Sequence, residues 1–153
     1  MPLPIGTYLP PLDGATDWLD APVAINDLQG RPTLVQFWAV SCPICKINMP
    51  SLLSLLKIYK SDGLQLLSVH MPRMDADIDV EKVRAAVSEL ALTGPCAIDN
   101  EHTIGDLFQT GGLWPCYFLF DAGGRLRSRA AGQLGLKMAE NSLKRLLAPE
   151  LAD

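Results

Sequence analysis

The feature that most limits what this chain can fold into is a pair of cysteines, Cys42 and Cys45, separated by two residues. Residues 32–38 before the pair are apolar and partly β-branched, which predicts a buried strand. Residues 46–59 after it carry apolar side chains at helical spacing, which predicts a helix packed along one side. The two cysteines therefore lie where a strand ends and a helix begins.

This position has a chemical consequence for the thiols. A thiol at a helix N-terminus faces unpaired backbone N–H groups and the positive end of the helix dipole, and both favour the thiolate. The second thiol follows about one helical turn later, close enough to form or break a disulfide. A zinc half-site is the alternative, but it needs a second pair of ligands, and the sequence contains no second CxxC, CxxH or HxxxH. The pattern predicts a redox pair and no bound metal.

Length and composition indicate a single domain, residues 1–153, with an ordinary core. The chain has 153 residues, 48% of them hydrophobic and 20% charged, and its net charge of −4 gives no support for nucleic-acid binding. No apolar run reaches the roughly 18 residues that span a membrane. Residues 1–6 lack the basic start and apolar run of a signal peptide, so we expect a cytoplasmic protein if Met1 is the natural start.

Residues 1–70 predict few elements besides the central strand and helix. Residues 1–20 are expected to be irregular, with Trp18 and Leu19 as an anchor, followed by an edge strand at 22–25 and a turn or helix at 26–30. Pro50 should kink the long helix, which residues 62–63 end. Residues 64–70 predict a second strand, parallel to the first because a helix crosses between them.

The second half predicts an inserted helix and strand, then a hairpin and a last helix. Acidic residues from Asp75 to Glu81 suit the N-terminus of a helix that continues to residue 90. They do not form a calcium loop, because Val80 and Ala86 stand where glycine and glutamate are needed. The remaining elements are a short strand at 96–99, helical turns at 102–108, antiparallel strands at 116–120 and 125–130, and a final helix from 136 that ends at Pro149.

This order of elements resembles a thioredoxin-like fold, an α/β architecture with a central mixed sheet flanked by helices. The resemblance rests on residues 37–39 ahead of the CxxC pair, on Pro50, and on Trp114-Pro115 ahead of the hairpin. The inserted helix and strand and the N-terminal extension make the chain similar to the TlpA/ResA group of thiol-disulfide oxidoreductases, and most of all to its small bacterial YkuV type.

The resemblance implies an enzyme that exchanges disulfides with protein substrates and a thiol electron donor, without a cofactor. Cys42, as the more exposed cysteine, would be the nucleophile, and Cys45 would resolve the mixed disulfide. The Trp114–Pro115 bond would be cis and face the pair. The residues implied to contact substrate are Trp38, Pro43, Ile44, Trp114 and Pro115.

Two positions depart from the family pattern. Gln36 stands where thioredoxins carry a buried aspartate, and because an amide cannot take a proton, the base that deprotonates Cys45 is unassigned. Ser41 replaces a tryptophan before the first cysteine, and we expect its hydroxyl to help cap the helix.

The other candidate groups have structural and functional interpretations. Cys96 and Cys116 fit small buried residues in strands, but a second disulfide or an auxiliary redox role stays open. His70 and His102 fall in no catalytic spacing. A peroxidase is a second possible enzyme, although Ala39 stands where peroxiredoxins place a threonine. A metal-binding module is a third possibility, and it would need His70 or His102 as a further ligand.

Overall fold

The computed structural model describes residues 2–148 and contains one mixed sheet of six strands in the order β1-β4-β3-β2-β5-β6. The central strands β2 and β3 are parallel, as predicted, and β5 and β6 form the predicted antiparallel hairpin. The strands are β1 (Asp17–Trp18), β2 (Thr33–Trp38), β3 (Gln65–His70), β4 (Cys96–Ile98), β5 (Cys116–Phe120) and β6 (Leu126–Ala131).

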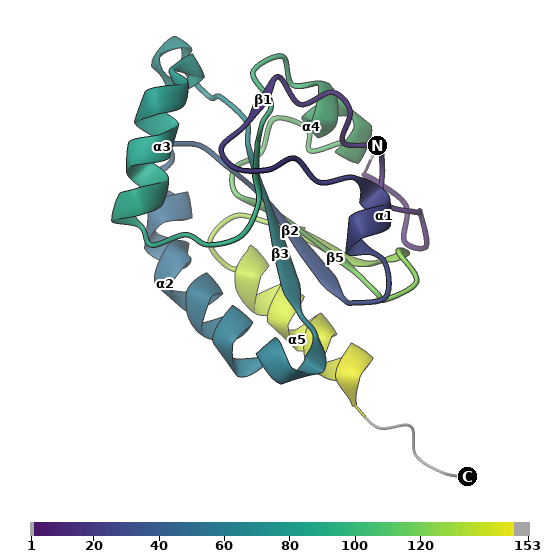
Figure 1. The fold of residues 1–153 in the computed structure, drawn as a ribbon. Coiled ribbons are helices and arrows are strands. Elements are labelled where there is room, and N and C mark those ends of the chain that lie inside the picture. The colour runs from purple at the N-terminus through teal and green to yellow at the C-terminus, as the bar shows by residue number, and fades with distance from the viewer. Residues whose placement is uncertain (1, 149–153) are drawn as a thin grey trace, which may run out of the picture.

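Helices cover both faces of this sheet (Figure 1). The α-helices are α1 (Ile25–Leu28), α2 (Pro43–Ile58), α3 (Val80–Glu89), α4 (Thr103–Phe108) and α5 (Gly135–Leu147), and short 3-10 helices span Lys60–Asp62 (η1) and Asp75–Ile78 (η2). Figure 1 shows α2, α3 and α5 on one side of the sheet and α1 and α4 on the other. This agrees with the predicted α/β class and with the inserted helix and strand, which are α3 and β4.

Alternation along β2 explains why the sheet has two cores. Leu34 and Trp38 belong to the apolar cluster beneath α2, α3 and α5, whereas Val35 and Phe37 belong to the cluster beneath the N-terminal segment, α1 and α4. Successive side chains of a strand point to opposite faces, so a strand covered on both faces is buried throughout and mostly apolar. All six residues of β2 are accordingly buried.

Two predictions for the first thirty residues were wrong: the edge strand at 22–25, and the absence of a strand in residues 1–20. Residues 22–25 do not form an edge strand, because the place beside β4 is taken by Asp17 and Trp18, which pair antiparallel with Ile98 and Ala97. The backbone N–H of Ala24 donates to Asp27 Oδ2 at 2.9 Å instead, and this bond starts α1. A strand of two residues carries no readable alternation, so it was missed.

The long helix begins earlier than predicted, at Pro43, and it continues through Pro50 to Ile58. Proline is favoured in the first helical turn because it has no N–H to leave unpaired there. Gly63, with φ of +85°, ends the following 3-10 turn. The expected stop of the last helix at Pro149 lies outside the described residues.

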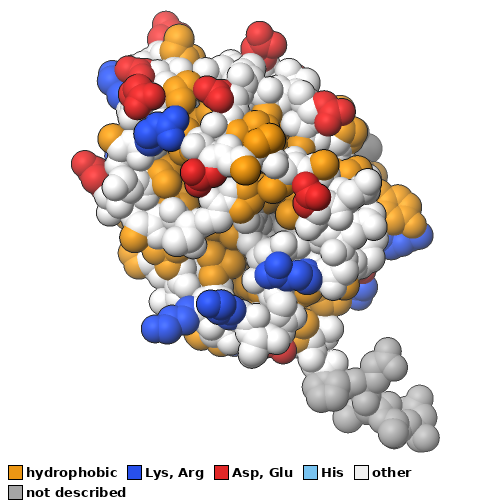
Figure 2. All heavy atoms as spheres, viewed as in Figure 1, with side chains coloured by type: hydrophobic (Ala, Val, Ile, Leu, Met, Phe, Trp, Pro, Cys, Tyr) orange, Lys and Arg blue, Asp and Glu red, His pale blue; other side chains and the backbone are white. Residues whose placement is uncertain are grey.

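One face of the surface is a mosaic of charge (Figure 2). Acidic side chains gather in its upper half and basic ones mostly in its lower half, with apolar atoms exposed between them. Among the described residues, no helix has both the length and the apolar character needed to cross a membrane.

Candidate active site

The two cysteines form a disulfide at the N-terminus of α2. Cys42 is the N-cap residue, Cys45 lies in the first turn, and their Cα atoms are 5.3 Å apart. The backbone N–H of Cys45 donates to Cys42 Sγ at 3.1 Å. A sulfur at this point receives one of the N–H groups that a helix leaves unpaired, as the sequence predicted, and this favours a thiolate when the disulfide is reduced.

The expectation that Cys42 is the more exposed cysteine was wrong, because each cysteine is 2% exposed. Both belong to the apolar cluster beneath α2, α3 and α5. The disulfide nevertheless lies just under the surface. Ser41 and Ile44 are half-buried, and Pro43 between the cysteines is exposed.

The loop that contains Trp114 and Pro115 lies at the same edge of the sheet. Cys116 pairs antiparallel with Phe37, so Pro115 lies at the level of the last residue of β2 and Trp114 extends past it, where the cysteine loop begins. The Trp114–Pro115 peptide bond is cis. Trp114 is half-buried against the apolar cluster that contains both cysteines. The sheet therefore brings these two loops, distant in the sequence, to one place.

Three of the five expected substrate contacts lie at or near the surface, namely Pro43, Ile44 and Trp114. Pro115 is buried, and Trp38 is 0% exposed. The Trp38 ring packs edge-to-face on His70, with ring centroids 4.9 Å apart. Trp38 is thus covered in the oxidised structure, directly before the cysteine loop, and its contact with substrate stays a prediction.

His70 contacts the cysteine loop directly, although it falls in no catalytic spacing in the sequence. It is 0% exposed at the end of β3, and its Nε2 accepts a hydrogen bond from the backbone N–H of Val40 at 3.0 Å. Burial lowers the pKa of His70 to about 4, although the charge of Asp77 opposes this shift. At neutral pH the ring is therefore uncharged and its Nε2 is an acceptor.

Asp77 is the residue of this site that sequence reasoning missed. In the sequence it is one of several acidic residues that suit a helix N-terminus, but in the structure it is 3% exposed and accepts a hydrogen bond from Ser41 Oγ at 2.6 Å. Ser41 is thus bound to Asp77, and Cys42 itself occupies the N-cap position expected to involve the Ser41 hydroxyl. One signal was present: Asp77 follows β3, and the carboxyl ends of parallel strands meet at one edge of the sheet.

Gln36 lies away from this network. Its Nε2 donates to Ser68 Oγ of the neighbouring strand at 2.9 Å and to Met49 Sδ of α2 at 3.8 Å, and the residue is 2% exposed. This arrangement is consistent with an amide that takes no part in proton transfer.

Cys96 and Cys116 are free thiols, each buried in a strand. No second disulfide forms, which agrees with the interpretation of both as small buried residues. Burial raises the pKa of each thiol to about 12. The Cys116 thiol donates to the Leu113 carbonyl at 3.2 Å.

The alternative of a metal module receives no support from the described part of the chain. Within residues 2–148, no three His, Cys, Asp or Glu side chains come together as metal ligands. Nε2 of His70 is engaged by Val40, and Nε2 of His102 lies 2.7 Å from the Pro72 carbonyl oxygen.

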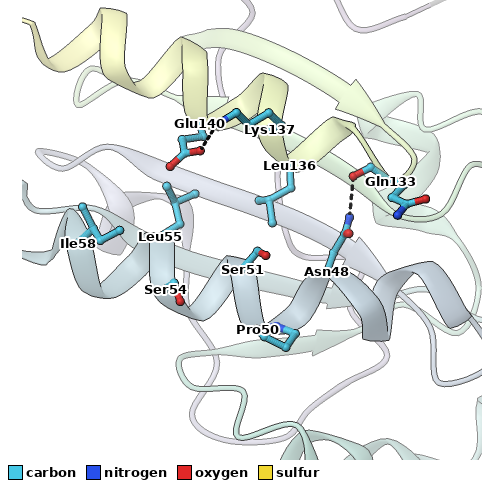
Figure 3. Close-up of a pocket in the computed structure, with 10 residues that line it drawn as sticks. All are labelled: Asn48, Pro50, Ser51, Ser54, Leu55, Ile58, Gln133, Leu136, Lys137 and Glu140. Atoms are coloured by element: carbon cyan, nitrogen blue, oxygen red, sulfur yellow. Dashed lines mark hydrogen bonds and ion pairs between the residues drawn. The ribbon is translucent and has the colours of Figure 1, made fainter.

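A cavity of about 460 Å³ lies between α2 and α5 (Figure 3). Its lining includes Asn48, Ser51, Leu55, Leu136 and Glu140, and neither cysteine is among the lining residues. Asn48 spans the gap at one end by donating to the Gln133 carbonyl at 3.2 Å. The cavity lies beside the redox helix and is separate from the disulfide.

Comparison with known proteins gives a consistent picture. Residues 5–129 match the AhpC/TSA family. The thiol-disulfide oxidoreductase YkuV of Bacillus subtilis is 38% identical over 141 residues, 92% of this chain and 94% of that protein. The thiol-disulfide oxidoreductase ResA of Oceanobacillus iheyensis is 28% identical over 121 residues, 79% of this chain and 60% of that protein.

The solved structures agree with the predicted fold. The solution structure of a thioredoxin-like protein in the oxidized form superimposes with a TM-score of 0.83 at 36% identity. The superposition covers 93% of this chain and 95% of that one. The resemblance inferred from the CxxC pair, the two prolines and the insertion is thereby confirmed.

Proposed function

This chain belongs to the AhpC/TSA family and is a thiol-disulfide oxidoreductase with a thioredoxin-like fold, and we propose that it reduces disulfides in protein substrates through Cys42 and Cys45. The observation that carries the proposal is the disulfide at the N-terminus of α2, where the Cys45 N–H donates to Cys42 Sγ. The same donor stabilises the Cys42 thiolate in the reduced protein, so Cys42 is the nucleophile.

Reduction of a substrate proceeds in two exchanges. The Cys42 thiolate attacks one sulfur of the substrate disulfide, a mixed disulfide forms, and the other substrate sulfur leaves as a thiolate that takes up a proton. Cys45 then loses its proton and attacks Cys42 Sγ, which releases the second substrate thiol. Two electrons have passed from the cysteine pair to the substrate. A thiol electron donor restores the reduced pair by the reverse exchange.

The Cys42–Cys45 pair donates electrons to substrates if its reduced form is only weakly stabilised. Strong oxidants of this kind have potentials near −120 mV because their reduced form is stabilised, whereas thioredoxin lies near about −270 mV. Here Pro43 and Ile44 place no cation between the cysteines that would further stabilise the thiolate of the reduced form. We expect equilibration with glutathione to give a potential closer to the thioredoxin value.

The surface proposed to bind substrate consists of Pro43 and Ile44 on one side and Trp114 on the other. These apolar groups suit an extended segment of a protein chain, and the backbone before Pro115 would align it across the disulfide. Since the disulfide itself is buried, the substrate sulfur must enter between these two groups.

Replacement of Cys42 tests the proposal. We expect Cys42→Ser to reduce insulin disulfides no faster than the uncatalysed background with the same dithiothreitol. Cys96→Ser is the matched control, because it removes a buried thiol away from the helix terminus, and it should keep the activity of the parent. Full activity in Cys42→Ser would refute the proposal.

We also propose that the protein acts in the cytosol. Cys96 and Cys116 are unpaired, which suits a compartment where thiols are kept reduced. Fractionation of cells that express the native gene at its own level should place the protein with cytosolic markers. Recovery outside the cytosol would contradict this.

A further inference from the structure

The segment from the end of β3 to η2, residues 70–77, makes several separate polar contacts with the loop that leads to Cys42. Nε2 of His70 accepts from the Val40 N–H at 3.0 Å, and Nη1 of Arg73 donates to the Ser41 carbonyl at 2.5 Å. Oδ2 of Asp77 accepts from Ser41 Oγ at 2.6 Å. Both residues before the nucleophile are therefore fixed by this one segment.

The Asp77 carboxylate is itself held in place by backbone hydrogen bonds from its own segment. Its Oδ2 also accepts the backbone N–H groups of Arg73 at 3.0 Å and Met74 at 3.2 Å. Burial by itself raises the pKa of this carboxyl, but the bonds from Ser41, Arg73 and Met74 and the nearby His70 lower it overall. A charged acceptor with backbone donors gives a short, directional bond to the Ser41 hydroxyl.

The same segment also binds the second loop of the site. The indole Nε1–H of Trp114 donates to the Met71 carbonyl at 2.7 Å. His102 bridges to the Pro72 carbonyl and packs against Trp114, with ring centroids 6.0 Å apart. Residues 70–77 thus connect the cysteine loop to the loop of Trp114 and Pro115.

We propose that Asp77 is a positioning residue for the nucleophile, acting through Ser41 to hold Cys42 at the N-cap of α2. The inference rests on the proposed role of Cys42 in disulfide reduction. In the reduced protein no disulfide fixes the Cys42 side chain. The bond between Ser41 and Asp77 then keeps the backbone before Cys42 in the position where its sulfur receives the Cys45 N–H.

A positioning role and a simple charge effect of Asp77 predict opposite changes in the reactivity of Cys42 when Asp77 is replaced. One experiment can therefore distinguish them. A carboxylate near a thiolate disfavours the charged sulfur, so removal of the Asp77 charge alone would raise the reactivity of Cys42. Removal of a positioning contact lowers reactivity, because the thiolate loses its alignment with the helix terminus. The other charged groups beside this loop are Arg73 and Lys46, both exposed, and neither is changed in the test.

The experiment isolates the first exchange in a Cys45→Ser background. There the Cys42 thiolate attacks 5,5′-dithiobis(2-nitrobenzoate), forms a mixed disulfide and releases one thionitrobenzoate, which is followed by absorbance. We expect Asp77→Ala and Ser41→Ala each to lower the second-order rate constant about tenfold at pH 7. The double variant should lose about tenfold as well, because both changes break the same contact.

Two variants serve as controls. Asp75→Ala removes an exposed carboxylate from the same 3-10 turn and should change the rate less than about twofold. Ser41→Thr keeps a hydroxyl and should recover most of the rate lost in Ser41→Ala, which a general loss of stability would not explain. The pH at which the rate is half-maximal should rise in Ser41→Ala, where no charge has been removed.

Three outcomes would overturn the inference: a faster Asp77→Ala variant, additive losses in the double variant, or an unchanged rate and pH profile in Ser41→Ala. Ser41→Ala and Ser41→Thr keep the test valid should Asp77→Ala fail to fold. None of these outcomes bears on the proposed function, which fails only if Cys42→Ser keeps insulin-reducing activity.

Discussion

The chain holds two pairs of buried cysteines, and they differ in almost everything except burial. Cys42 and Cys45 are each 2% exposed, and Cys96 and Cys116 are 2% and 3% exposed. The first pair lies at a helix N-terminus and forms a disulfide, whereas the second pair lies in β4 and β5 and stays free. Burial therefore does not decide which thiols take part in redox chemistry.

The two pairs differ in the hydrogen bonds of their sulfur atoms and in the effect of burial on the pKa values of the thiols. Cys42 Sγ receives a backbone N–H that the helix cannot use, so a negative charge on this sulfur is stabilised. Cys116 instead donates its proton to a carbonyl, and burial raises the pKa of both strand thiols to about 12. The Trp38 side chain and the His70 backbone act to lower the pKa of Cys96, but the effect of burial on this pKa outweighs them.

The largest expected effect is in alkylation of the reduced, native protein. At pH 7.5 a thiol with a pKa near 12 is ionised roughly a thousandfold less than an ordinary cysteine. We therefore expect iodoacetamide to label Cys42 at least about a thousandfold faster than Cys96 or Cys116. Mass spectrometry of timed samples measures this ratio. In denaturant without reductant only two thiols should react, and four after reduction. If Cys96 or Cys116 of the native protein were labelled as fast as Cys42, the proposed difference between the two pairs of cysteines would be wrong.

Loss of the resolving cysteine should have the next largest effect. Cys45→Ser keeps the nucleophile but cannot release the substrate, so turnover of insulin should fall about a hundredfold or more while mixed disulfides accumulate. Non-reducing gels detect the trapped species. The matched change Cys116→Ser should trap nothing. An active Cys45→Ser enzyme would assign resolution to another thiol, Cys116 being the first to examine.

His70 is a buried histidine beside the reactive cysteines, and its lowered pKa makes the stability of the protein depend on pH. Its pKa is about 4 in the folded protein and about 6.5 when unfolded, so below pH 6.5 the unfolded chain binds more protons. Stability should thus fall as pH drops, by about 2 kcal/mol between pH 7.5 and pH 5. Urea unfolding measures the loss, and His70→Gln, which keeps an acceptor for Val40, should flatten it. An equal slope in both proteins would show that His70 is not held neutral.

The smallest expected effect concerns the strand cysteines as packing residues. Cys96→Ala and Cys116→Ala each remove one buried atom and should cost about 1 kcal/mol of unfolding free energy. Insulin reduction per folded molecule should change less than about twofold. Thermal unfolding and activity assays together check this. A large loss of activity at unchanged stability would give one of these thiols a redox role.

Much of the fold could be predicted because its signals are local. The apolar run of β2, the helical spacing of apolar residues in α2 and the alternation of β6 each reflect neighbouring residues, and the structure agrees with them, although α2 begins three residues before its predicted start. The two-residue strand β1 was missed because its pairing with β4 spans about eighty residues of chain. The burial of Cys42 was missed for a related reason, since it depends on what packs over the helix terminus.

By itself, the sequence determined that two thiols meet a helix N-terminus, because strand, CxxC pair and helix follow one another within a few residues and need no distant partner. Only the tertiary structure decided what surrounds them. Asp77 lies 36 residues beyond Ser41 and His70 lies 30 beyond Val40, yet parallel pairing of β2 with β3 brings all four to one edge of the sheet. Hydrogen bonds between such distant segments arise from the packing of the whole chain, and no local pattern contains them.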